Sequence, residues 1–170
     1  MPRYPICFSL ALLVAVYVGC GSDSLRRVPQ HADKILVVKS THTLTLMGGD
    51  QVLRTYKVAL GRNSVGPKTR RGDHKTPEGL YIIDSKKEHS RFYRALHISY
   101  PDAEDRKHAQ LGGYDPGADV EIHGIENGLG WIGRLHRAVD WTDGCVALTD
   151  DEMDEVWNAV DVGTPVEIRP

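Results

Sequence analysis

One cysteine and one histidine form the pair of residues best suited to nucleophilic chemistry. Cys145 is preceded by Gly144, and His123 is followed by Gly124. A cysteine attacks as its thiolate and therefore needs a base near its sulfur. A histidine at the end of a strand is such a base, and the carbonyl of Gly124 could accept its Nδ1 proton, which leaves Nε2 for the sulfur. We predict that Cys145 is a nucleophile and that His123 is its proton acceptor and donor.

The glycine before the cysteine predicts a site for a negatively charged oxygen. Gly144 permits a sharp turn, so that the backbone amides of Gly144 and Cys145 could both face the oxyanion of a tetrahedral intermediate. These residues predict acyl-transfer chemistry.

Three residues between the histidine and the cysteine are candidates for substrate binding. Arg137 suits a substrate carboxylate, because a guanidinium binds carboxylates through two hydrogen bonds, and His136 stands beside it. An equal alternative is that His136 and Arg137 cover a nearby helix or loop. Trp141 either lines a substrate groove or packs in the interior.

A metal site is the main alternative chemistry. His123, His136 and Cys145, with Asp143 nearby, could supply zinc ligands for a hydrolase. Structural zinc sites use short paired spacings such as Cys-x₂-Cys, and this sequence has none. We therefore expect no metal and no cofactor.

The N-terminus predicts export. Arg3 precedes an apolar run over residues 6–18, which is shorter than the ~20 residues of a membrane span and typical of a secretory signal peptide. The run ends in Tyr17-Val18-Gly19-Cys20, which resembles a bacterial lipobox except that Tyr17 replaces the usual Leu. We expect a signal peptide over 1–19, lipidation of Cys20 and a polar tether over 20–33. An ordinary signal peptide or an uncleaved anchor would also place the rest outside the cytoplasm.

Composition is that of a single soluble globular domain. The 170 residues are 41% hydrophobic and 26% charged, with a net charge of −2, which argues against a disordered chain and against a strongly cationic nucleic-acid binder. With Cys7 in the signal peptide and Cys20 lipidated, Cys145 would be the lone thiol in an oxidising compartment. Such a thiol is a hazard unless it is buried or needed.

Apolar patterning predicts a mainly β domain that positions the cysteine and histidine. A hairpin turn is expected at 48–50, an irregular loop over 61–77 and a helix over 101–110. Thr149 and Glu152 form a capping box for a helix through Val160. The predicted strands cover residues 35–38, 41–47, 52–60, 79–84, 120–123 and 166–168.

Residues 34–169 resemble the YkuD domain, the L,D-transpeptidase catalytic domain of bacterial envelopes (ErfK/YbiS/YcfS/YnhG type). The family carries His-Gly and then Ser/Thr-x-Gly-Cys, which match 123–124 and 142–145 here. Its upstream strand ending in Gly and its Thr-Pro-x-Gly match 60–61 and 76–79. The resemblance implies a β-sandwich-like catalytic domain over 34–170, with a few short helices near the active site and the C-terminus. It also implies a thioester on Cys145, orientation of His123 by Gly124, and a position of Thr142 near the site.

The resemblance further implies peptidoglycan stem peptides as substrate, in the periplasm or cell envelope. Family members break the bond after meso-diaminopimelate and pass the acyl group from the cysteine to an amine or to water. The expected role is peptidoglycan biosynthesis or remodelling, with consequences for cell wall organisation and cell shape. The alternatives are an L,D-carboxypeptidase or endopeptidase, which hydrolyses the stem peptide or its lipoprotein link, and a non-catalytic peptidoglycan-binding module. A lipid anchor would supply the membrane contact, and no nucleic-acid partner is expected.

Some positions depart from the common family pattern. Asp143 stands where many members have His or Lys, and Ala147 where many have Arg or Asn. The interval from His123 to Cys145 is 22 residues, longer than expected of common transpeptidases, and resembles the YafK-like branch. That branch includes an enzyme that hydrolyses the link between peptidoglycan and a lipoprotein, so the acyl acceptor stays open. A basic cluster either attracts anionic peptides or is a solvated loop; it comprises Lys68, Arg70, Arg71, His74 and Lys75.

Overall fold

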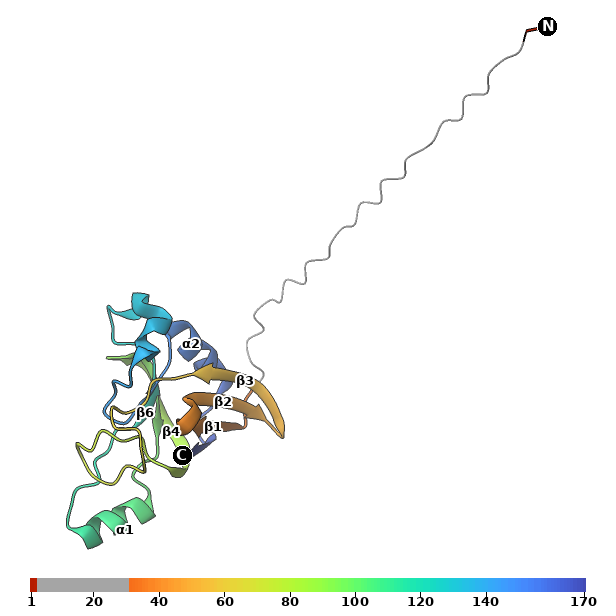
Figure 1. Ribbon diagram of the computed structural model, residues 1–170. Helices are drawn as coiled ribbons and strands as arrows, with labels where there is room; N and C mark the ends of the chain where they lie inside the picture. The colour runs from red at the N-terminus through yellow and green to blue at the C-terminus, as the bar shows by residue number, and fades with distance from the viewer. Residues whose placement is uncertain (3–30) are drawn as a thin grey trace.

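The computed structural model describes residues 1–2 and 31–170 (Figure 1). The predicted signal peptide from residue 3 onward, Cys20 and most of the tether therefore lie outside the described residues. The strands are β1 (Lys34–Val38), β2 (Thr43–Gly48), β3 (Gln51–Lys57), β4 (Gly79–Ser90), β5 (Tyr93–Ile98), β6 (Glu121–His123), β7 (Val146–Ala147) and β8 (Pro165–Arg169). The helices are η1 (Lys39–Thr41), α1 (Ala103–Gly112), η2 (Gly130–Ala138) and α2 (Asp150–Ala159).

The strands form one sheet in the order β3-β2-β1-β8-β4-β5-β6-β7. Long strand β4 joins its two halves, because Gly79–Ile82 pair with β8 and later residues pair with β5. The two outer ends of the sheet also meet, since Ala59 and Ala147 exchange backbone hydrogen bonds of 3.0 and 2.8 Å. The sheet therefore curves back on itself, and the predicted mainly β fold is confirmed.

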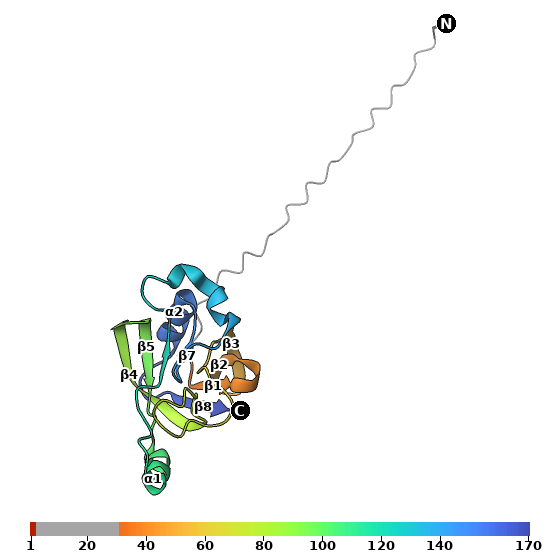
Figure 2. The ribbon, with the colours of Figure 1, turned by 60° about the vertical axis from the view of Figure 1, so that its left-hand side comes forward.

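Alternating apolar residues build the core between the sheet and α2. Leu44 and Leu46 of β2 are fully buried, as their alternation with threonines predicts. Helix α2 begins with the predicted capping box of Thr149 and Glu152 and buries Met153, among others, on its inner face. Figure 2 shows that α2 lies against the strands, whereas α1 projects from the body. Helix α2 thus brings its N-terminal end close to the end of β6.

Four elements were not predicted from the sequence: β5, β7, η1 and η2. Strand β4, predicted over 79–84, continues to Ser90, because the charged residues Lys86 and Lys87 still pair with β5 through their backbone. Strand β7 has only two residues, too few to show a period. Helix η2 contains a non-helical residue, Gly133. In the part of the chain that is described, no helix has the length and apolar character needed to cross a membrane.

Candidate active site

Parallel pairing of β6 with β7 brings the histidine and the cysteine to one face of the sheet. Ile122 pairs with Val146 and His123 with Ala147. Continuing this register by one residue places Cys145 opposite Glu121, and alternate residues on paired strands share a face. The Glu121 amide lies 3.4 Å from Cys145 Sγ, in agreement with that register. Residues 22 positions apart in the sequence therefore share one site.

The imidazole of His123 is buried and fixed in orientation. Its side chain is 2% exposed, and Nδ1 lies 2.7 Å from the carbonyl oxygen of Gly124. Because a carbonyl only accepts hydrogen bonds, Nδ1 carries the proton and Nε2 is left as the basic nitrogen. Burial lowers the pKa of His123, which keeps the ring neutral at neutral pH. Phe92 and Trp141 hold the ring, with centroid distances of 4.6 and 5.7 Å.

The surroundings of Cys145 favour the thiol over the thiolate. Its Sγ donates to the carbonyl of Asp119 at 3.7 Å and accepts from the Glu121 amide. Burial raises the pKa of Cys145 to about 12, and the hydrogen bond from the Glu121 amide opposes it; the charges of Glu121 and Asp143 add to the rise, while that of Lys68 lowers the pKa. Both pKa shifts favour the neutral thiol and the neutral imidazole at neutral pH.

The turn before the cysteine requires glycine and is tied by a threonine. Gly144 has φ +132°, and a Cβ there would lie 2.5 Å from the carbonyl oxygen of Lys75. The hydroxyl of Thr142 accepts from the Gly144 amide at 3.2 Å and donates to the Cys145 carbonyl at 2.8 Å. Of the two amides predicted to face an oxyanion, that of Gly144 is therefore occupied. The Cys145 amide has no hydrogen-bond partner among the described residues.

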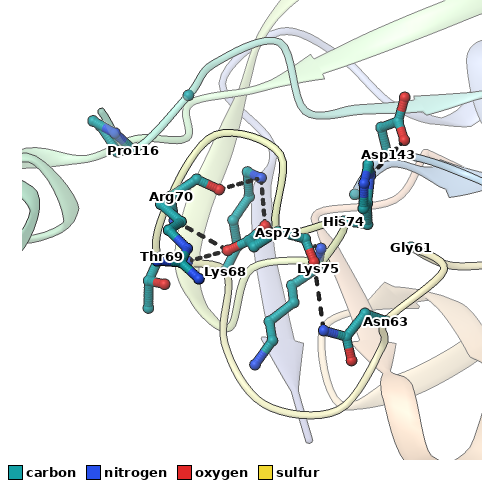
Figure 3. Close-up of polar contacts among 12 residues, drawn as sticks. Gly61, Asn63, Lys68, Thr69, Arg70, Asp73, His74, Lys75, Pro116 and Asp143 are labelled. Carbon is teal, nitrogen blue, oxygen red and sulfur yellow. Dashed lines mark hydrogen bonds and ion pairs between the residues drawn. The ribbon is translucent and has the colours of Figure 1, made fainter. Parts of the chain in front are cut away.

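The loop over residues 61–77 packs against this turn (Figure 3). Asp143, which follows Thr142, accepts from Arg62 and from His74 Nδ1, the latter at 2.7 Å. These bonds lower the pKa of Asp143, the one from Arg62 most strongly. The loop is thus fastened to the residue next to Gly144.

A buried ion pair organises the same loop. Lys68 Nζ lies 2.9 Å from Asp73, and their side chains are 5% and 7% exposed. Asp73 also accepts from the backbone amides of Thr69, Arg70 and Lys75 (Figure 3). Burial alone would raise the pKa of Asp73, but these bonds lower it to about 2. The basic cluster seen in the sequence therefore divides: Lys68 is a buried, paired residue, and Arg70 and Arg71 are exposed.

His136 and Trp141 form a second ring pair beside His123. Trp141 Nε1 donates to His136 Nδ1 at 3.3 Å, so the His136 proton is on Nε2. That Nε2 is buried and has no partner among the described residues. Burial lowers the pKa of His136 to about 4. The two rings adjoin an apolar hollow of about 220 Å³, whose other walls include Ile125, Leu129, Ile132, Leu135 and Val139.

Arg137 is bound within the protein. Its guanidinium forms an ion pair with Glu152, whose carboxylate also accepts from the Thr149 amide at 3.2 Å. The arginine therefore fastens η2 to the start of α2, and of the two readings of the sequence the structure favours cover of a helix. Within residues 31–170, no group of three or more His, Cys, Asp or Glu side chains is arranged to hold a metal ion.

Sequence reasoning missed two neighbours of Cys145 and His123. Phe92 stacks on His123 from the end of the unpredicted β4–β5 hairpin, and nothing in the sequence pointed to it. Lys68 lies close to Gly144, since a Cβ on that glycine would be 3.8 Å from Lys68 Cδ. A lysine in a polar loop gives no sign of being buried.

Comparisons with known proteins agree with the geometry. The putative L,D-transpeptidase YafK of Escherichia coli (strain K12) is 34% identical over 132 residues, which cover 74% of this chain and 46% of that protein. The putative L,D-transpeptidase YqjB of Bacillus subtilis (strain 168) is 28% identical over 167 residues, 98% of this chain and 85% of that protein. The chain thus spans about half the length of YafK.

Solved structures show the same fold. The helical cell shape determining protein Pgp2 of Campylobacter jejuni superimposes with a TM-score of 0.61 at 23% identity, over 82% of this chain and 49% of that one. An L,D-transpeptidase of Xylanimonas cellulosilytica gives a TM-score of 0.54 at 16% identity, over 82% of this chain and 61% of that one. Residues 32–168 match the L,D-transpeptidase catalytic domain, YkuD. This chain therefore belongs to the YkuD family of L,D-transpeptidase catalytic domains.

Proposed function

We propose that this protein is a cell-envelope cysteine acyltransferase, an L,D-transpeptidase that acts on peptidoglycan stem peptides. One observation carries the proposal. The carbonyl oxygen of Gly124 lies 2.7 Å from His123 Nδ1, which fixes the tautomer and leaves a basic Nε2 on the sheet face that also holds Cys145. Nucleophile, oriented base and backbone amide are the parts that acyl transfer needs.

The chemistry proceeds through a thioester. Cys145 Sγ attacks the carbonyl carbon of meso-diaminopimelate in the stem while its proton moves to His123 Nε2. The Cys145 amide donates to the oxyanion. The intermediate collapses as the carbon–nitrogen bond breaks, and the imidazolium of His123 returns the proton to the leaving amine.

The second half-reaction reverses these roles. An acceptor amine attacks the thioester, His123 takes its proton, and the thiol of Cys145 is restored when the imidazolium protonates the sulfur. Water in place of the amine would give a hydrolase with the same residues.

The proposed place of action is the periplasm or cell envelope. Supporting this, the sequence starts with a predicted signal peptide over 1–19 and a lipobox-like Cys20, so a lipid anchor is part of the proposal. An envelope lipoprotein is proposed as a further acceptor or substrate. The family membership supports peptidoglycan as the target.

The test is product analysis with purified full-length protein. Tetrapeptide muropeptides and lipoprotein-linked sacculi are incubated with wild type and with Cys145→Ala, and products are followed by mass spectrometry. A Cys145-dependent cross-linked dimer or exchanged terminal residue is the expected result. A shortened stem or released lipoprotein without a new amide would identify a hydrolase. Binding to sacculi without Cys145-dependent turnover would identify a binding module, and loss of activity on chelation a zinc enzyme.

A further inference from the structure

A single peptide unit connects the candidate base to a carboxylate on α2. The carbonyl of Gly124 accepts from His123 Nδ1 at 2.7 Å, and the amide of the same peptide bond, that of Ile125, donates to Asp150 Oδ1 at 2.8 Å. We infer that Asp150 is a positioning residue that holds His123 and stabilises its protonated form through the Gly124–Ile125 peptide. The inference rests on the proposed function, in which His123 is protonated in each half-reaction.

Two glycines, which have no side chain, leave the space that the Asp150 carboxylate occupies. A Cβ on Gly124 would lie 2.7 Å from Asp150 Oδ1, and a Cβ on Gly130 would overlap Asp150 Oδ2. The Gly124 amide is itself held by the carbonyls of Phe92 and Arg94 at 3.1 and 3.2 Å. Glycine at 124 thus serves the approach of Asp150 as well as the orientation of His123.

Asp150 differs from the other acids in the first turn of α2. Glu152 closes the capping box and pairs with Arg137, and Asp151 is exposed. Acids in a first helical turn ordinarily complement the helix dipole. Asp150, in addition, accepts a hydrogen bond from backbone outside its own helix.

Hydrogen bonds in a chain strengthen one another. When His123 gains a proton, its Nδ1–H becomes a stronger donor, which polarises the peptide and strengthens the amide bond to the carboxylate. The buried ring needs this support, because burial disfavours its charged form. The Asp150 carboxylate, acting through a peptide, therefore has the role of the third residue of a triad, which orients the imidazole and stabilises its charged form.

Neighbouring charged groups also shift the pKa values of His123 and Asp150. Glu121 favours the charged form of His123, and the neighbouring His136 is neutral. Burial raises the pKa of Asp150, as do the charges of Asp154 and Asp151, while the Ile125 amide opposes them.

The test compares Asp150→Asn with the matched control Asp151→Asn in the full-length protein. Asparagine keeps an acceptor oxygen for the Ile125 amide and removes the charge. We expect Asp150→Asn to lower the pKa of His123, measured by NMR, and to reduce kcat on tetrapeptide muropeptides about tenfold with little change in KM. Asp151→Asn should change neither.

An unchanged His123 pKa and kcat in a folded Asp150→Asn protein would overturn the inference. If that variant does not fold, the wild type decides: the NMR signal of the His123 Nδ1 proton should shift as Asp150 titrates, and an unshifted signal would equally overturn it. Failure of the proposed function is distinguishable from failure of this inference. If the wild type shows no Cys145-dependent turnover, the His123 pKa can still be compared between the wild type and the two variants.

Discussion

His123 and Asp150 bind opposite ends of one peptide unit, at 2.7 Å to its carbonyl and 2.8 Å from its amide. The histidine ends β6, and the aspartate begins α2. The sheet and the helix therefore meet at the candidate catalytic base, and the packing of α2 bears directly on the orientation of the imidazole.

The pH dependence of activity should show one acid limb and a broad plateau. His123 acts as a base only when neutral, and its pKa is lowered by burial, so kcat/KM should fall only as the pH drops below the ordinary value of about 6.5. Cys145, with a pKa of about 12, should remain a thiol across neutrality. The measurements are kcat/KM and the rate of Cys145 alkylation by iodoacetamide from pH 4 to 10. Alkylation at a full thiolate rate by pH 6 would show an ion pair instead.

Gly144→Ala should abolish activity and loosen the loop over 61–77. The new Cβ would lie 2.5 Å from the Lys75 carbonyl, and a φ of +132° is strained for alanine. We expect at least a 100-fold loss of kcat/KM and a destabilisation of about 2 kcal/mol. The control is Gly128→Ala, which has a φ of +89° but open space around it. It should lose about 1 kcal/mol of stability and keep its activity. Equal activity in the two variants would contradict the steric argument.

Gly124→Ala should displace the carboxylate of Asp150. The added methyl would lie 2.7 Å from Asp150 Oδ1 and 2.9 Å from Tyr93 Cβ, so the peptide that holds His123 must shift. We expect at least a tenfold loss of kcat, read together with the NMR signal of the His123 Nδ1 proton. A variant with native kcat and an unmoved Nδ1 signal would show that the backbone tolerates the methyl group.

Asp73→Asn should destabilise the loop beside the cysteine. The substitution leaves Lys68 buried without its charged partner, which typically costs about 3–5 kcal/mol. Urea unfolding and hydrogen exchange of residues 61–77 measure the effect. The exposed pair of Arg71 and Asp115 provides the control, and Asp115→Asn should change stability little. Adding Lys68→Met to Asp73→Asn should restore part of the loss; if it restores none, the unpaired charge is not its cause.

His136 should make the fold less stable in acid. Its pKa is about 4 in the folded protein and about 6.5 in the unfolded chain, so the unfolded chain binds more protons between these values. The free energy of unfolding should therefore fall as the pH drops through this window, by about 3 kcal/mol from this group. His136→Gln keeps an acceptor for Trp141 and should flatten the profile. His108→Gln, at an exposed site, should not, and equal slopes in the two variants would contradict the assignment.

The sequence alone predicted Cys145 and His123 as the reactive pair and many of the strands and helices that surround them. Cys145 and His123 could be chosen because each stands beside a glycine in a recognisable motif. Such a motif is formed by residues that are adjacent in the sequence, so no tertiary structure is needed to find it. The alternation in β2 and the capping box of Thr149 predicted their elements for the same reason.

The burial and the partners of individual side chains could be read only from the tertiary structure, because they depend on contacts between segments distant in the sequence. Asp150 is one of three acids in the first turn of α2, and only the packing of α2 against β5 brings it to the Ile125 amide. Lys68 was one of several loop cations until the fold buried it with Asp73, and Arg137 a candidate for substrate until Glu152 bound it. Burial and pairing are properties of the whole packed chain, because the partners are chosen by the sheet register and by helix docking rather than by spacing along the sequence.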